Sequence, residues 1–94
     1  MQIKEFNPNV FVENIINEYN ENPENYYISE IYDFVMDTMD VSNIVEVSVI
    51  KNKWDNFYTV IIHYKRMYDG KIIETSYNIH PKYIYYVYYI QQKI

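Results

Sequence analysis

The spacing of apolar residues changes near the middle of the chain and divides it into a helical part and a strand part. In the first part, apolar side chains recur every three or four residues within 8–20 and 23–39, which predicts two amphipathic helices. An Asn-Pro pair begins each segment, at Asn7-Pro8 and Asn22-Pro23. This pair is typical of a helix N-cap followed by proline in the first turn. The first part of the chain is therefore expected to be helical.

In the second part, β-branched and aromatic residues alternate with polar ones, which is the period of β-strands. Three strands are expected, at 44–51, 56–67 and 71–79. Asp69-Gly70 contains the only glycine of the chain and lies between the last two runs, so it predicts a two-residue type I′ hairpin turn. In that hairpin Lys65 would pair with Glu74, and such an opposite-charge pair is favourable across strands.

The first hairpin, with 52–55 as its loop, buries the same face of the middle strand as the second hairpin does. The expected inward residues are Val45, Val47, Val49, Val60, Ile62, Tyr64 and Tyr77. Because two separate hairpins agree on one buried face, the pattern predicts a three-stranded antiparallel meander.

The last segment, 83–94, is compatible with a fourth strand or with a helix. A helix is favoured, because the apolar residues share one helical face and Pro81 suits a helix start. The residues of that face are Ile84, Val87, Ile90 and Ile94. The expected structure is a single α+β domain over 1–94, with two N-terminal helices, a three-stranded antiparallel β-meander and a C-terminal helix in two layers.

Charge is distributed unevenly between the two halves of the chain. Residues 1–50 contain ten acidic residues and one lysine, a net charge of −9, whereas residues 51–94 contain three acidic and seven basic residues, a net charge of +4. Together these give the formal charge of −5. An acidic front and a basic back create a directional field that influences which partners bind.

Four carboxylates of the second predicted helix stack along one line, because they are three, four and three residues apart. They are Glu30, Asp33, Asp37 and Asp40, and we call them the acidic stripe. One interpretation is the solvated face of an amphipathic helix. In the other, the acidic stripe, with Glu21, Glu24 and the acids of the first helix, imitates a row of phosphates and binds a basic protein partner.

Apolar residues also occur on the sheet face that is expected to be exposed. Ile50, Phe57 and Ile61 lie there among polar neighbours, together with Ile44. Apolar side chains on a solvent-facing sheet usually indicate a further covering element or a partner. We expect a homodimer through this face, since isologous pairing is the commonest symmetric solution.

Basic and aromatic residues near the two hairpin ends suggest an alternative function. They are Lys51, Lys53, Trp54, Lys65, Arg66 and Lys71. Proteins that bind single-stranded nucleic acid combine such charges with stacking aromatic rings. The net charge of −5 opposes this function because it repels phosphate, so nucleic acid is the less favoured partner. A structural role in a virion or other assembly is a third interpretation.

No residue pattern points to catalysis, a metal or a cofactor. Neither His63 nor His80 has a carboxylate at metal-ligand spacing. His63 would face Ser76, but a nucleophile and its base also need an orienting group and an oxyanion hole. A single glycine excludes a phosphate-cradling loop, and the lack of cysteine excludes disulfides and thiolate sites. We expect a protein that is not an enzyme and uses no cofactor.

Composition indicates a kind of source and a class of function. Leucine and alanine are absent, whereas Ile, Asn, Tyr and Lys are frequent, and their A/T-rich codons favour a low-G+C genome such as that of a virus or phage. No apolar run is long enough to span a membrane and the N-terminus lacks the apolar core of a signal peptide, so a soluble cytoplasmic protein is expected (in the host cell, if viral). With the acidic front, this favours a small inhibitor of a host nucleic-acid-handling or defence complex, of the anti-CRISPR kind.

Overall fold

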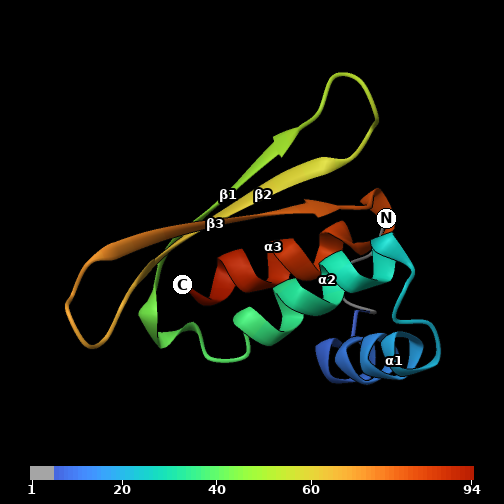
Figure 1. Ribbon diagram of the computed structural model, residues 1–94, viewed down its shortest axis with the longest axis horizontal. Coiled ribbons are helices and arrows are strands. Elements are labelled where there is room, and N and C mark those ends of the chain that lie inside the picture. The colour runs from blue at the N-terminus through green and yellow to red at the C-terminus, as the bar shows by residue number, and fades with distance from the viewer. Residues whose placement is uncertain (1–5) are drawn as a thin grey trace.

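The computed structural model describes residues 6–94, and Figure 1 shows how their elements are arranged. The elements run in the order α1 (Pro8–Glu21), α2 (Tyr26–Asp37), a 3₁₀ turn (Val41–Asn43), β1 (Ile44–Lys51), β2 (Tyr58–Lys65), β3 (Ile72–Ile79), a second 3₁₀ turn (Pro81–Tyr83) and α3 (Ile84–Lys93). The strands form one antiparallel sheet in the order β1-β2-β3. The predicted α+β fold, with its two N-terminal helices, β-meander and C-terminal helix, is confirmed.

Asparagine caps set where the first two helices begin. The side chain of Asn7 accepts hydrogen bonds from two backbone N–H groups of the first turn of α1, and Pro8 follows it as predicted. Helix α2 begins later than predicted, because Asn25 rather than Asn22 is its N-cap and accepts the hydrogen bond of a first-turn N–H at 3.1 Å. The Asn-Pro signal is thus right for α1 and three residues early for α2.

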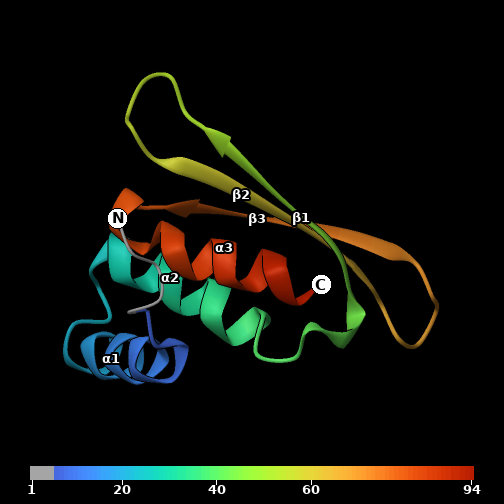
Figure 2. The ribbon, with the colours of Figure 1, turned by 180° about the vertical axis from the view of Figure 1, so that it is seen from behind.

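The three helices lie on the same side of the sheet, as Figure 1 and Figure 2 show from opposite directions. Helix α2 contacts the sheet at β3 and α3 contacts it at β1, whereas α1 packs against α2 and α3. The fully buried side chains of the core include Ile31, Phe34, Val60, Ile79 and Val87. The opposite face of the sheet has no covering element within residues 6–94.

The β2–β3 hairpin has the predicted strands but a register shifted by two residues. Glu74 pairs with His63 instead of Lys65. The loop explains the shift, because it contains the four residues 67–70, and Gly70, at its last position, adopts a φ of 72°. The predicted two-residue type I′ turn is therefore wrong.

The register of the β1–β2 hairpin is also shifted by two residues, but here the loop keeps its predicted length and begins one residue later. Its loop contains the four residues 53–56 rather than 52–55, and the last of them, Asn56, has a φ of 66°. Both shifts are by an even number of residues, so each side chain stays on its predicted face. The inward residues Val47, Val60, Ile62 and Tyr77 are buried, as predicted.

The first strand departs from the prediction at its start. A β-bulge between Ile44 and Glu46 turns Ile44 into the core and leaves Val45 54% exposed. The predictions that Val45 is buried and Ile44 exposed are wrong, because the extra residue of a bulge reverses the alternation of faces locally. Val49 and Tyr64 are half-buried against the core.

The C-terminal segment is a helix, as predicted. Its buried residues are Ile84, Tyr86, Val87 and Ile90. Tyr86 stacks on Phe11 of α1, with ring centroids 4.8 Å apart and ring planes 11° from parallel, so the first and last helices are joined by aromatic packing. In the described part of the chain, no helix has the length and hydrophobicity needed to cross a membrane.

The two hairpin loops are built alike. In each, an aspartate at the third loop position, Asp55 or Asp69, accepts a hydrogen bond at 3.1 Å from the backbone N–H two residues ahead. The fourth position has positive φ, and the second carries an exposed ring, Trp54 (94% exposed) or Tyr68 (81% exposed). Sequences that differ at three of four positions thus adopt the same turn.

We expect the fourth loop position to favour residues that adopt positive φ readily. Gly70→Ala should lower the free energy of unfolding by about 1 kcal/mol, because a Cβ atom disfavours the left-handed conformation. Asn56→Ala should lower it by less, because asparagine already has a Cβ atom and only its better tolerance of positive φ is lost. A Cβ at Gly70 would lie 3.7 Å from Lys65 Cε, which is an ordinary van der Waals contact. The loss of stability in Gly70→Ala would therefore come from the backbone conformation and not from a steric clash. Urea denaturation measures these differences. The matched control is Gly70→Asn, which should cost less than Gly70→Ala, and equal costs would contradict the explanation.

Candidate functional site

Two carboxylates of the acidic stripe fasten α2 to β3. Glu30 Oε1 accepts a hydrogen bond from the backbone N–H of Asn78 at 2.7 Å, and Asp37 Oδ2 accepts one from the hydroxyl of Tyr77 at 2.6 Å. We call these two bonds the α2–β3 clamp. Because β3 is an edge strand, the Glu30 bond also satisfies a backbone donor that would otherwise be open at the sheet edge.

The other two stripe residues lie in different environments. Asp40 accepts a hydrogen bond from the backbone N–H of Ser42 at 3.0 Å, and this bond lowers the pKa of the Asp40 carboxyl. Partial burial, and then the charge of the neighbouring Asp37, raise the pKa of Asp33. Both effects on Asp33 disfavour negative charge, so a nearby cation would stabilise this region. The use of the acidic stripe as a contact surface stays a prediction.

Further carboxylates of the N-terminal half are exposed on α1 and the turn after it. They are Glu13, Glu18, Glu21 and Glu24. We refer to these four residues and the exposed Asp33, all in the helical part of the chain, as the acidic helical surface, and none of the five is in an ion pair within residues 6–94. Residues 6–50 include nine acidic residues and no lysine or arginine, so this segment contains no basic residue that could neutralise the surface.

The sheet face that the helices leave uncovered carries part of the predicted dimer surface. Ile50 is 53% exposed and Ile61 is half-buried near the middle of this face. Ile72, which the sequence analysis did not single out, is 54% exposed at its far end. Phe57 lies instead in an aromatic cluster at the end of the sheet, with its ring centroid 5.3 Å from that of His80. The apolar part of this face is therefore spread out rather than continuous.

A histidine lies between two glutamates across the three strands. His63 pairs with Glu46 of β1 and Glu74 of β3, and the predicted pairing of His63 with Ser76 is wrong. Its Nε2 is 3.0 Å from Glu74 Oε1 and its Nδ1 is 3.8 Å from Glu46 Oε1, so the carboxylates approach opposite ring nitrogens. Within residues 6–94 no group of three His, Cys, Asp or Glu side chains is placed to hold a metal ion.

The structure divides the residues of the alternative nucleic-acid site into two groups. Lys51, Lys53 and Trp54 lie at the β1–β2 end, and Lys65, Arg66 and Lys71 lie at the β2–β3 end. Figure 1 shows these loops at opposite ends of the sheet, and the eight residues of β2 separate them by about 26 Å. Arg66 is also paired with Asp69, its Nε donating to Oδ1 at 3.1 Å. The six residues therefore do not form one basic surface.

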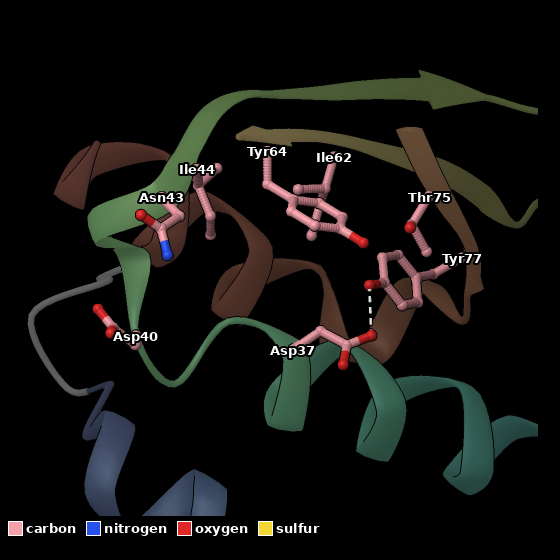
Figure 3. A pocket seen from close by; sticks show the side chains of 8 residues that line it. All are labelled: Asp37, Asp40, Asn43, Ile44, Ile62, Tyr64, Thr75 and Tyr77. Atoms are coloured by element: carbon pink, nitrogen blue, oxygen red, sulfur yellow. Dashed lines mark hydrogen bonds between the residues drawn. The ribbon is translucent and has the colours of Figure 1, made fainter. Parts of the chain in front are cut away.

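A hollow of about 270 Å³ opens where the C-terminal end of α2 meets the sheet (Figure 3). It is lined by Asp37, Asp40, Asn43, Ile44, Ile62, Tyr64, Thr75 and Tyr77, and we call it the tyrosine–aspartate hollow. Figure 3 shows the rings of Tyr64 and Tyr77 extending into it from the sheet. Burial, and then the bond to Asp37, raise the pKa of Tyr77, so its hydroxyl stays protonated and remains a donor.

The sequence analysis assigned Asp37 and Asp40 to a candidate site, named Ile44, Ile62, Tyr64 and Tyr77 only as residues of the sheet, and did not name Asn43 or Thr75. Asn43, Thr75 and Tyr64 come from three separate elements, and no local motif connects them. The available signal was the prediction that Tyr64 and Tyr77 point inward, because a buried tyrosine hydroxyl normally finds a polar partner.

Comparison with known proteins gives no match to any family model, to any curated protein or to any solved structure. The function therefore has to be inferred from the surfaces described above. The acidic helical surface and the tyrosine–aspartate hollow are both electronegative, and both lie on the helical side of the molecule.

We expect the Tyr77 hydroxyl to be a stabilising part of the α2–β3 clamp. Tyr77→Phe should lower the free energy of unfolding by about 1–2 kcal/mol, because the Asp37 carboxylate loses its donor in a partly enclosed site. Tyr64→Phe is the matched control, since the Tyr64 hydroxyl makes no hydrogen bond among the residues drawn in Figure 3. Chemical denaturation of both variants gives the comparison. Equal losses, or a loss only for Tyr64→Phe, would contradict the role of the clamp.

Proposed function

We propose that this chain is a non-enzymatic protein-binding protein and that its acidic helical surface contacts a basic partner. The supporting observation is the segregation of charge, with nine acidic residues and no lysine or arginine between residues 6 and 50. Complementary potentials across an interface accelerate encounter and exclude partners of the wrong charge. The carboxylates of this surface are exposed and outside the α2–β3 clamp, so they are available to a partner.

We propose further that the partner belongs to a nucleic-acid-handling or defence complex, and that the protein is a viral or phage inhibitor acting in the host cytoplasm. Carboxylates held on two packed helices can imitate a row of phosphates, which a basic groove binds by charge. The low-G+C composition and the small size fit such a source. Nucleic-acid binding by the chain itself has less support, because the basic residues of the predicted site are divided between the two distant hairpin ends.

Self-association through the uncovered sheet face is a second candidate, supported by the exposure of Ile50 and Ile72. In an isologous contact Ile61, near the centre of the face, would lie close to its own copy. Ile61→Lys should then convert a dimer to a monomer, as measured by analytical ultracentrifugation at tens of micromolar. Val10→Lys on α1 is the control, because it places the same charge at an exposed apolar position on the other side of the molecule. A wild-type chain that sediments as a monomer would reject this candidate.

The principal proposal is tested by reversing charges on α1. Glu18→Lys combined with Glu21→Lys should weaken binding to a partner captured from host lysate by more than about tenfold, a loss of roughly 1.4 kcal/mol or more. The wild-type affinity should also fall as salt rises, since exposed charges are screened. Isothermal titration with the purified partner measures both effects, and thermal unfolding checks that the variant is folded.

The matched control for this test is Glu46→Lys combined with Glu74→Lys. It changes the net charge by the same amount but places the new charges on the uncovered sheet face. Equal weakening of partner binding by both double variants would show that the effect depends on net charge alone. It would then reject the acidic helical surface as the contact site. Tight binding of the wild type to bare single-stranded DNA or RNA would instead favour the nucleic-acid alternative.

A further inference from the structure

The tyrosine–aspartate hollow combines features that suit the side chain of a basic residue. We infer that it receives an arginine or lysine side chain of the partner, which holds the two proteins in one orientation. This inference rests on the proposed function and adds a defined site to it. A diffuse acidic surface attracts a basic partner without fixing its position, whereas a hollow that takes one side chain does fix it.

The walls of the hollow suit the two parts of such a side chain. Ile44 and Ile62 are buried residues of the sheet and give it an apolar lining, against which an alkyl stem packs. The rings of Tyr64 and Tyr77 extend into the space (Figure 3), and a guanidinium or ammonium group is attracted to the face of an aromatic ring. Apolar lining and cation-attracting groups therefore meet in one cavity.

The two carboxylates of the hollow retain free acceptor capacity. Asp37 uses Oδ2 to accept from Tyr77, and Asp40 uses Oδ1 to accept from the backbone of Ser42. An ionised carboxylate has about four lone-pair sites, so each can accept further hydrogen bonds. Hydrogen bonds from a guanidinium or ammonium to carboxylates are charge-assisted and are among the stronger ones in proteins.

Within residues 6–94 the chain supplies no cation at this place. Helix α2 ends at Asp37 with no basic residue in its last turn, and no lysine or arginine lines the hollow. The C-terminal end of a helix carries partial negative charge from its carbonyl groups, which adds to that of the carboxylates. The combined potential favours a cation and disfavours an anion such as phosphate.

The size of the hollow limits the occupant. Its volume of about 270 Å³ is slightly below the range of about 300–1,000 Å³ that is typical of pockets for drug-sized ligands. Its lining includes the exposed Asp37 and Asp40 at and after the C-terminal end of α2, so a projecting side chain can reach it from solvent. One long basic side chain matches these conditions better than a free organic ligand.

The site can be tested without the partner by using small probes of the side chain. Ethylguanidinium and n-butylammonium represent the ends of arginine and lysine, and ethylurea is the neutral counterpart of the former. Each is titrated into the ¹⁵N-labelled chain at constant ionic strength and followed by NMR. The cationic probes should cause saturable shifts of the amides of Asn43, Thr75 and Tyr77, whereas ethylurea should not.

Two matched variants test whether the Asp40 carboxylate binds the probe. Asp40→Asn keeps an oxygen that accepts from Ser42 but removes the charge, and it should weaken ethylguanidinium binding about tenfold. Asp55→Asn is the control, because Asp55 also accepts from a backbone N–H two residues ahead and lies in the distant β1–β2 loop. It should leave probe binding unchanged.

The inference is overturned if the cationic probes give no saturable shifts, if the shifts lie outside the hollow, if ethylurea reproduces them, or if both variants weaken binding equally. These failures are distinguishable from failure of the proposed function. Loss of partner binding on reversal of Glu18 and Glu21, without a probe site in the hollow, would reject the hollow alone. A probe site in the hollow without an effect of that reversal would reject the acidic helical surface alone.

Discussion

The α2–β3 clamp is the interaction on which the placement of the helical layer depends. Glu30 and Asp37 are seven residues apart, so they lie two turns apart on nearly the same face of α2. Their partners, Asn78 and Tyr77, are adjacent in β3, and the length of the Tyr77 side chain spans the difference between them. Each bond has a charged acceptor and contributes about 1.5–3 kcal/mol at most. Together with the buried Phe34 between them, these bonds hold the helix along the sheet edge.

The position of α2 decides which acidic groups are bonded within the fold and which make no internal bond within residues 6–94. The clamp and the turn at Asp40 engage three carboxylates of the acidic stripe, while those of α1 stay exposed. The opposite edge strand, β1, is also hydrogen-bonded to a helical side chain, since Gln91 of α3 donates to the backbone carbonyl of Val47 at 2.8 Å. With a helical side chain bonded to each edge strand, addition of a further strand is disfavoured. Binding is then expected at surfaces rather than at sheet edges.

Several features of the fold could be read from the chain because they depend on neighbouring residues. Helical periodicity, the Asn7 cap and strand alternation each act over a few residues, and they predicted the order of elements and most of the buried face. The turn types could not be read so directly. Asp-Gly fits a type I′ turn and also the last two positions of a four-residue loop, and the closing pair of the hairpin decides between them. The bulge at Val45 likewise has no glycine or proline to signal it.

The sequence by itself determined the α+β order, the inward face of β2 and β3 and the separation of acidic from basic residues, because each follows from residue type and local spacing. The tertiary structure alone decided that Glu30 and Asp37 bond to β3, that the basic residues of the two hairpins lie far apart, and that Asn43, Tyr64 and Thr75 meet around one hollow. The physical reason is that a carboxylate on a helix has the same local sequence signal whether it faces water or a strand. Its partners lie about forty or more residues away in the chain, and only the packing of α2 against the sheet brings them within hydrogen-bonding distance.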